Sequence, residues 1–138
     1  MSLAHPAKGK VIRVEGESIV FKPSNSTYEL ILKSPGYAGP VGEAVELVIH
    51  GKARKSYTVP SGGLFVSPIM GPPKVLQGRV KDVSGDQITL NCGVVMNITL
   101  STEPGAIEMA NGPIAANGLV NVILMAGASA ELLQTSVA

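Results

Sequence analysis

One sequence pattern occurs twice in this chain, and it limits the possible fold more than any other feature. Residues 9–21 read GKVIRVEGESIVF, and residues 78–90 read GRVKDVSGDQITL. Both segments fit the pattern G-[KR]-V-x-x-V-x-G-[ED]-x-I-x-[FL], in which five positions are identical. In each, a glycine separates two apolar runs that have the length of β-hairpin strands. The repetition of one such unit predicts two tandem copies of the same small domain.

The correspondence continues downstream of both hairpins. Residues 28–33 and 96–101 alternate between apolar and polar side chains, which is typical of half-buried strands. A Pro-Gly pair follows each of these segments, and the apolar positions of 45–49 then match those of 120–124. Each copy therefore offers four strands in one order, whereas the closing segments 56–70 and 126–138 do not resemble each other.

The sequence predicts an all-β protein made of two tandem small Greek-key barrels. Sixteen glycines and ten prolines favour short strands joined by turns. A short helix is predicted near 102–111, because Thr102 can cap it, Pro104 suits its first turn and Gly112-Pro113 ends it. A helix between the third and fourth strands favours an OB-type barrel over the alternative, an SH3-like barrel. The proline-rich residues 67–73 place the boundary between modules 1–70 and 71–138.

The repeated pattern, its alternating strand and the spacing of Gly42, Val45 and Ile49 resemble small OB-type barrels. Two such copies in one short chain are similar to tandem Mop-like (molybdate-binding) proteins. That resemblance implies an oxyanion held between packed modules by backbone amides with Ser, Thr or Lys side chains. The binding signature Ile-Thr-x-x-Ser of that family is not clearly matched, so no binding residue is assigned from it.

Charge is distributed unevenly along the chain. All eleven basic residues and five acidic residues lie at or before Lys81, and five acidic residues and no basic ones follow it. All five aromatic residues and eight of the eleven basic ones lie in the first module, which is therefore basic and aromatic, whereas the second is acidic and apolar. An OB-type barrel with these features can bind single-stranded nucleic acid. The predicted contact residues are Lys52, Arg54, Lys55, Tyr57 and Arg13.

The second module has a strand that is apolar in both phases. Residues 119–125 read LVNVILM, so both faces of this strand require burial. One face fits the core of its own module, and the other requires the first module or another chain. The main functional hypothesis is therefore a non-catalytic module acting in self-assembly, as a homo-oligomer, or in binding a protein partner. The predicted interface residues are Leu119, Val120, Ile123 and Met125.

Residues able to carry catalysis are sparse, and no enzyme activity, cofactor or metal is expected. The two histidines, His5 and His50, have no neighbouring nucleophile pattern, and no phosphate-loop motif is present. The single cysteine, Cys92, has no cationic residue near it in sequence and is interpreted as an inert thiol.

Neither secretion nor membrane insertion is expected from the sequence. The first twenty residues carry no apolar leader-like run, and one cysteine offers no disulfide within the chain. The longest apolar run, residues 119–128, is too short to span a bilayer. A cytoplasmic location without membrane contact is the expectation.

Overall fold

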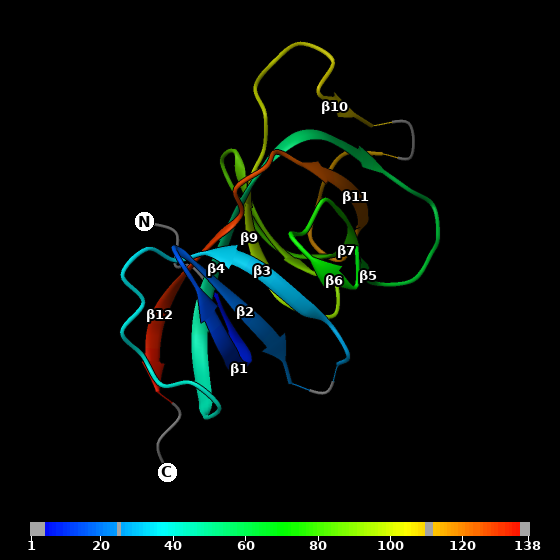
Figure 1. Cartoon of the computed structure of the whole chain (residues 1–138). Coiled ribbons are helices and arrows are strands. Elements are labelled where there is room, and N and C mark those ends of the chain that lie inside the picture. Colours follow the sequence, from blue (N-terminus) through cyan, green and yellow to red (C-terminus); the bar gives the residue numbers. More distant parts are fainter. Residues whose placement is uncertain (1–4, 25, 110–111, 136–138) are drawn as a thin grey trace.

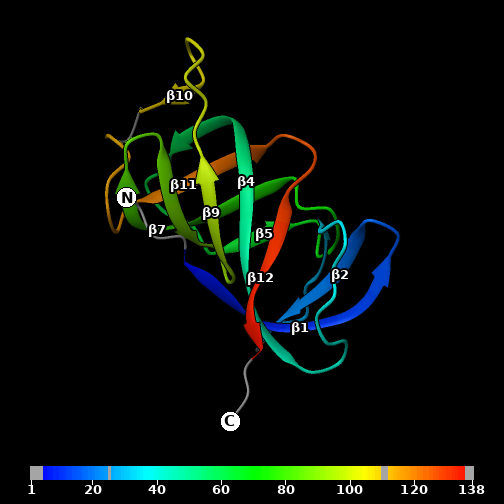
Figure 2. The same cartoon turned by 90° about the vertical axis from the view of Figure 1, so that its left-hand side faces the viewer.

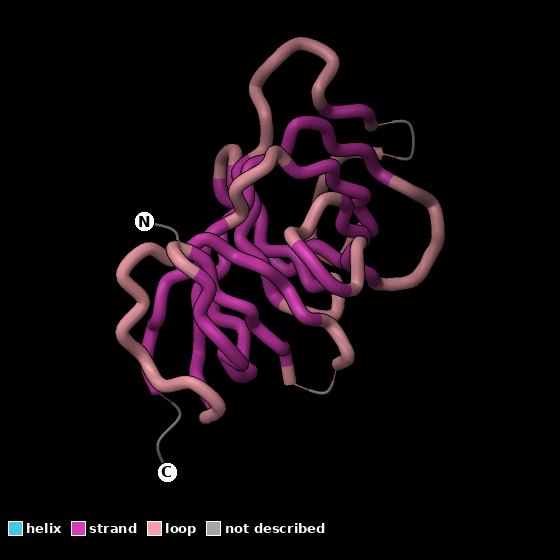
Figure 3. The backbone as a smooth tube through the Cα atoms, viewed as in Figure 1, coloured by secondary structure: helices cyan, strands magenta, loops and turns pink. Residues whose placement is uncertain are grey.

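The computed structural model of this chain describes residues 5–24, 26–109 and 112–135, with side chains up to residue 133. Every regular element in these residues is a β-strand, and the strands join into one twelve-stranded sheet (Figure 3). The predicted all-β class is confirmed. The strands are β1 (Pro6–Glu15), β2 (Ser18–Pro23), β3 (Glu29–Lys33), β4 (Ala44–Thr58), β5 (Phe65–Ser67), β6 (Met70–Gly71), β7 (Val75–Ser84), β8 (Gln87–Asn91), β9 (Val95–Thr99), β10 (Ile107–Glu108), β11 (Leu119–Leu124) and β12 (Ser129–Thr135).

The strand pairings form two closed cycles. The first cycle runs from β1 to β2, β3, β12 and the first part of β4 (residues 44–50), which pairs with β1 again. The second runs from β7 to β8, β9, the second part of β4 (residues 50–58) and β11, which returns to β7. Strand β4 belongs to both cycles, and Figures 1 and 2 show it running from one lobe of the molecule into the other.

Each cycle contains one strand that lies beside the other repeat in sequence. β12 lies beyond the second repeat in sequence, yet it pairs with residues 45–50 of β4 in the first cycle. The second part of β4 follows the first repeat, yet it pairs with β11 in the second cycle. Strands are therefore exchanged across the predicted boundary between residues 70 and 71.

The two repeated hairpins have the same register. The pairing shifts by one residue between Val11 and Arg13 on β1, and at the matching place between Val80 and Asp82 on β7. A β-bulge of this kind increases the local twist and bends the strand, which helps a sheet to close on itself. The shared pattern in the sequence thus corresponds to a shared backbone geometry.

Two glycines of the repeat allow the hairpin strands to come close together. A Cβ atom on Gly9 would lie 2.3 Å from the backbone oxygen of Lys22, and one on Gly78 would lie 2.4 Å from that of Asn91. Any other residue at either position would push the strands apart. The repeated pattern begins with glycine for this steric reason.

One apolar core fills both cycles. Phe21, Leu47 and Ile49 are fully buried in the first cycle, as are Leu76 and Leu90 in the second. These side chains belong to one continuous cluster. Each contributes roughly 1.5 to 3 kcal/mol through its removal from water. The chain therefore holds its two strand cycles together by packing as well as by strand exchange.

The N-terminal end of β1 is tied to the second cycle by one amide side chain. The Asn97 side chain accepts a hydrogen bond from the His5 backbone N–H at 3.0 Å and donates one to the His5 carbonyl at 2.9 Å. The same Nδ2 also donates to the Ile49 carbonyl at 3.1 Å. Asn97 on β9 thus links β1 to the centre of β4.

The helix predicted near 102–111 is wrong over residues 102–109, and residues 110–111 lie outside the described residues. The Ala106 N–H donates to the Glu103 carbonyl, and Gly105 has a φ of 78°. Proline followed by a glycine of positive φ is the arrangement of a type II turn. The chain then continues as β10, which pairs in parallel with Ser56 and Tyr57 and lets Ile107 pack against the core. Pro104 therefore begins a turn and not a helix.

No helix able to cross a lipid bilayer occurs in the part of the chain that the structure describes.

Candidate functional site

The predicted nucleic-acid residues on β4 all lie on its outer side. The pairing with β11 skips Arg54, so this residue forms a bulge and both Arg54 and Lys55 face outward. Lys52 and Arg54 are exposed, whereas Lys55 and Tyr57 are half-buried. The Lys55 ammonium lies 2.8 Å from the Glu108 carboxylate, and this hydrogen bond raises the pKa of Lys55.

The fifth predicted residue, Arg13, is separated from the others. It lies on β1 beyond Lys10, which pairs with Ala44 at the first residue of β4, whereas Lys52 lies near the middle of β4. Its guanidinium forms a hydrogen bond and ion pair with Glu15, which raises the pKa of Arg13. Arg13 and Lys55 are therefore each neutralised by a neighbouring carboxylate.

None of the five aromatic side chains is exposed. Phe21 is fully buried, and the other four are half-buried: Tyr28, Tyr37, Tyr57 and Phe65. The Tyr28 hydroxyl accepts a hydrogen bond from the Val66 N–H, and the Tyr37 hydroxyl donates one to the Pro40 carbonyl. Burial raises the pKa of Tyr37. Phe21 belongs to the core, and Tyr28 and Tyr37 pack against it.

The predicted interface residues differ in exposure. Leu119 and Val120 are buried inside the chain, at 4% and 0% exposure, because β11 lies between β4 and β7. Ile123 is half-buried, and only Met125 is exposed. The apolar character of both strand faces is thus satisfied mostly within the chain.

Cys92 is fully buried, and its Sγ–H donates a hydrogen bond to the Val94 carbonyl. Burial raises the pKa of this thiol to about 12, so it remains protonated at neutral pH. Among the described residues, no three side chains of His, Cys, Asp and Glu gather into a group able to hold a metal ion.

A polar pocket of about 320 Å³ lies where the chain passes between the two cycles. Ligand pockets usually start at roughly this volume. We call it the crossover pocket. The described residues that line it are His50, Gly51, Lys52, Thr99, Met125, Ala126, Gly127 and Ser129.

Glycines shape both passages of the chain at the crossover pocket. A Cβ atom on Gly51 would lie 3.0 Å from the Leu124 side chain. Glycine at this position therefore lets β4 pass close to the apolar side chains of the second cycle. Gly127 has a φ of 97°, which favours glycine, in the connection between β11 and β12. The pocket is therefore built where the two exchanged strands enter their cycles.

The polar groups of the crossover pocket come in two matched pairs. Lys52 on β4 pairs with Thr99 on β9, and Ser129 on β12 pairs with Lys33 on β3. Each pair joins the third strand of a cycle, β9 or β3, to the exchanged strand beside it and combines one lysine with one hydroxyl. Lys33 Nζ lies 3.8 Å from the place that a Cβ atom on Gly127 would occupy, so it stands at the rim of the pocket.

No carboxylate occurs among the described residues of this lining. An ammonium group offers three hydrogen-bond donors, and each hydroxyl offers one more. His50 adds an imidazole that pairs across the strands with Ser129. A lysine ammonium and hydroxyl donors that have no carboxylate beside them are suited to binding an anion.

Sequence reasoning did not single out Thr99 or Ser129, because each stands far from Lys52 along the chain. The repeat as aligned in the sequence does not find them, because it matches residues 28–33 with 96–101 and so places Lys33 against Ser101, whereas the register in the structure matches Lys33 with Thr99. Ser129 lies in the closing segment, which has no matching segment in the first repeat.

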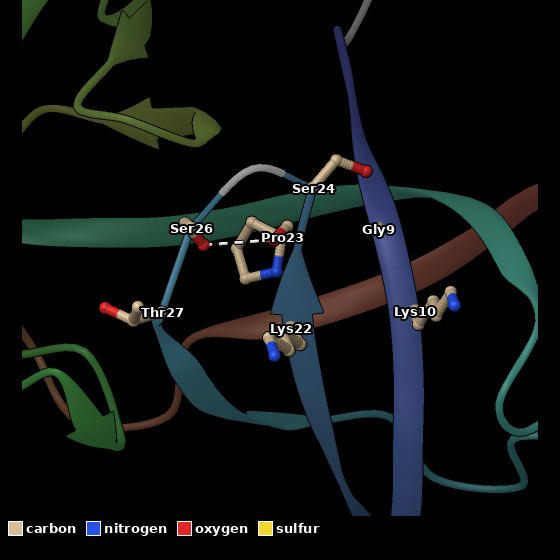
Figure 4. A pocket seen from close by; sticks show the side chains of 7 residues that line it. All are labelled: Gly9, Lys10, Lys22, Pro23, Ser24, Ser26 and Thr27. Atoms are coloured by element: carbon tan, nitrogen blue, oxygen red, sulfur yellow. Dashed lines mark hydrogen bonds between the residues drawn. The ribbon is translucent and has the colours of Figure 1, made fainter.

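A second polar pocket, of about 560 Å³, lies at the β1–β2 hairpin (Figure 4). We call it the hairpin pocket. Its polar side chains are Lys10, Lys22, Ser24, Ser26 and Thr27. Figure 4 shows the two lysines on neighbouring strands and the three hydroxyl residues at the end of β2 and in the following turn.

Comparison with protein families, with curated proteins and with solved structures finds no match to the chain.

Proposed function

We propose that this chain is a non-catalytic binding module that holds a small oxyanion in the crossover pocket. The observation that carries the proposal is the lining of this pocket: Lys52, His50, Thr99 and Ser129 converge without a carboxylate. The resemblance to tandem molybdate-binding proteins leads to the same class of ligand, through Ser, Thr and Lys side chains between two modules.

The proposed architecture is a tandem pair of OB-type Greek-key barrels. Support comes from the order of pairing in each cycle, since β4 lies beside β1 in the series β4-β1-β2-β3, and β11 lies beside β7 in the series β11-β7-β8-β9. A fourth strand that returns beside the first is the Greek-key arrangement. The matched bulges of β1 and β7 support an origin by duplication.

A small anion is favoured over single-stranded nucleic acid for two reasons. Binding of single strands relies on aromatic side chains that stack on bases, and all five aromatic residues here are at least half-buried. Two of the predicted cationic contacts, Lys55 and Arg13, already have carboxylate partners. Lys52 lies instead in a pocket of the size of a small ligand.

Binding without chemistry fits the side chains in and around the pocket. The single thiol is buried and protonated, and it is not among the residues that line the pocket. A cytoplasmic location belongs to the same proposal, because a free cysteine without a disulfide is typical of a reducing compartment.

The test is thermal unfolding of the full chain in the presence of molybdate, tungstate, sulfate or phosphate, with ionic strength held constant by chloride. A ligand at about one hundred times its Kd stabilises a protein by about 2.7 kcal/mol, which appears as a higher Tm. Lys52→Gln and Thr99→Val should each reduce this shift. Lys81→Gln removes the same charge at an exposed site outside the pocket and is the matched control. Equal Tm values in all salts would contradict the proposal.

Self-association or binding of a protein partner is the second candidate function. Three large apolar side chains, Leu64, Ile69 and Met70, are between 43% and 64% exposed within one short segment. Exposed apolar side chains that cluster in this way are typical of contact surfaces. Light scattering over a concentration series tests this candidate. A monomer at every concentration would argue against a homo-oligomer, and unchanged scattering of the variant Met70→Lys would show that this segment is not the contact.

A further inference from the structure

The hairpin pocket brings two lysines of the same charge directly opposite each other. Lys10 on β1 and Lys22 on β2 are cross-strand partners in the antiparallel pairing. Like charges in this position destabilise a strand pair. The neighbour of Lys10 on its other side is Ala44, and the β2–β3 register continues from Phe21 and Leu30 to Lys22 and Glu29. Glu29 is not among the described residues that line the pocket, and no other carboxylate is among them. An anion bound between the lysines would remove this repulsion.

The second repeat serves as an internal comparison for these lysines. The matching strands β7 and β8 have the same register, but there Arg79 stands opposite Asn91. The Arg79 guanidinium uses one of its five N–H donors in a hydrogen bond to the Asn117 carbonyl at 3.0 Å. The strand pairing forms equally well without a lysine pair, so Lys10 and Lys22 are not required by the fold.

The hydroxyl groups of the hairpin pocket are also particular to the first repeat. Gly93 occupies the place in the second repeat that matches Ser24. The chain between the paired residues Leu90 and Met96 is three residues shorter than that between their counterparts Phe21 and Leu30. Ser26 and Thr27 therefore have no counterpart. Lys22 and the hydroxyl residues of this turn are thus particular to the first repeat, whereas Lys10 has a basic counterpart in Arg79.

The donors in this pocket come mainly from side chains. The Ser26 hydroxyl already donates to the Pro23 carbonyl at 3.0 Å, and the Ser24 N–H donates to the Lys8 carbonyl. The remaining side-chain donors that line the pocket are the ammonium groups of Lys10 and Lys22 and the hydroxyls of Ser24 and Thr27. Figure 4 shows the Thr27 hydroxyl directed away from both lysines. Two ammonium groups match the charge of a dianion, and hydroxyls suit its oxygen atoms.

We infer that the hairpin pocket binds a dianionic phosphate group, either free phosphate or the terminal phosphate of a small molecule. This site is separate from the crossover pocket, with which it shares no lining residue. Its volume of about 560 Å³ leaves room for an organic group attached to the phosphate. The inference does not depend on the oxyanion proposed for the crossover pocket.

The experiment is a nuclear magnetic resonance titration of the full-length, ¹⁵N-labelled protein with inorganic phosphate and, separately, with glycerol 3-phosphate. Chloride keeps the ionic strength constant. We expect the amide signals of Lys10, Lys22, Ser24 and Thr27 to shift and to saturate. Saturation with both compounds identifies the phosphate group as the ligand, and saturation with glycerol 3-phosphate alone identifies a phosphate ester.

Variants separate this site from the crossover pocket. Lys22→Gln should weaken phosphate binding at the hairpin amides about tenfold, which corresponds to the loss of one charge-assisted hydrogen bond. Lys10→Gln should have the same effect, and both side chains are exposed, so the fold is expected to tolerate either change. Lys52→Gln and the matched control Lys81→Gln should leave this binding unchanged. The absence of saturable shifts at the hairpin amides, or equal weakening by Lys22→Gln and Lys81→Gln, would overturn the inference.

Discussion

Gly42 and Asn117 occupy matching places in the two repeats, and their backbones make the same contact. The Gly42 N–H donates to the Val11 carbonyl at 2.8 Å, and the Asn117 N–H donates to the Val80 carbonyl at 2.7 Å. Both residues have positive φ values, 84° and 70°. Glycine adopts this conformation without strain, and asparagine tolerates it better than most residues.

This relationship predicts how substitutions at Gly42 affect stability. A Cβ atom on Gly42 would meet nothing within 4 Å, so only the backbone conformation opposes a side chain there. Gly42→Asn should lower the free energy of unfolding by less than about 1 kcal/mol, whereas Gly42→Val should lower it by about 1 to 2 kcal/mol. Unfolding in urea measures both values. Equal costs for the two variants would show that the positive φ is not the constraint.

The close approach of the hairpin strands makes a second prediction. Gly9→Ala and Gly78→Ala should each destabilise the protein by about 2 kcal/mol or more, because the added methyl group meets backbone atoms that cannot turn away. Gly63→Ala is the matched control, since a Cβ atom at Gly63 would have open space around it. Urea unfolding measures the free energy of unfolding of the three variants, which should be lower for the Gly9 and Gly78 variants than for the Gly63 variant. A Gly9 variant as stable as the Gly63 variant would contradict the steric account.

Cys92 predicts a loss of stability at alkaline pH. In the unfolded chain the thiol ionises near its ordinary pKa of 9.0, whereas in the folded chain it ionises at about 12. The unfolded state therefore releases this proton first. The contribution of the protonated Cys92 thiol to the free energy of unfolding is fully present below about pH 9 and is lost as the pH rises towards 12. The slope is at most about 1.4 kcal/mol per pH unit.

Two measurements check this behaviour of Cys92. The free energy of unfolding should fall between pH 9 and pH 10.5 more steeply in the native sequence than in Cys92→Ala, which lacks the thiol. The thiol of the folded protein should also react slowly with a disulfide reagent at pH 8 and quickly in urea. Rapid reaction without urea would mean that Cys92 is accessible.

The exchange of strands between the cycles predicts how fragments behave. Residues 1–70 lack β12 and residues 71–138 lack the second part of β4, so each fragment alone leaves a cycle open. Neither fragment should unfold cooperatively alone, and an equimolar mixture should recover a cooperative transition in circular dichroism. The control is a mixture of 1–70 with 71–128, which lacks β12. This mixture should recover less of the cooperative transition than the mixture of 1–70 with 71–138. A fragment that melts alone like the full chain would contradict the exchange.

Much of this fold can be predicted from the repeat, and the exchange of strands cannot. Gly16 and Gly85 mark the hairpin turns in the sequence, and both have positive φ values in the structure. The pattern does not say which cycle receives the last strand, because that choice depends on the connections. Ile49 continues directly along β4 into the second cycle, whereas Leu124 reaches β12 through the turn at Gly127.

The predicted helix and the hairpin pocket show two limits of local reasoning. Thr102 and Pro104 are helix-start residues, but Pro104-Gly105 fits a turn equally well, and the packing of Ile107 against the core favours the turn. Lys10 and Lys22 lie apart in sequence and become neighbours only through the register of the hairpin. The charges from Lys52 to Lys55 are close together in the sequence, whereas this pair is not.

The most direct test of the central claim is a crystal structure of the protein grown with tungstate, whose metal atom gives a strong anomalous signal. The account predicts an anomalous peak in the crossover pocket, with oxyanion oxygens about 3 Å from Lys52 Nζ, Thr99 Oγ1 and Ser129 Oγ. An empty crossover pocket at a tungstate concentration that occupies other sites on the protein would contradict the account.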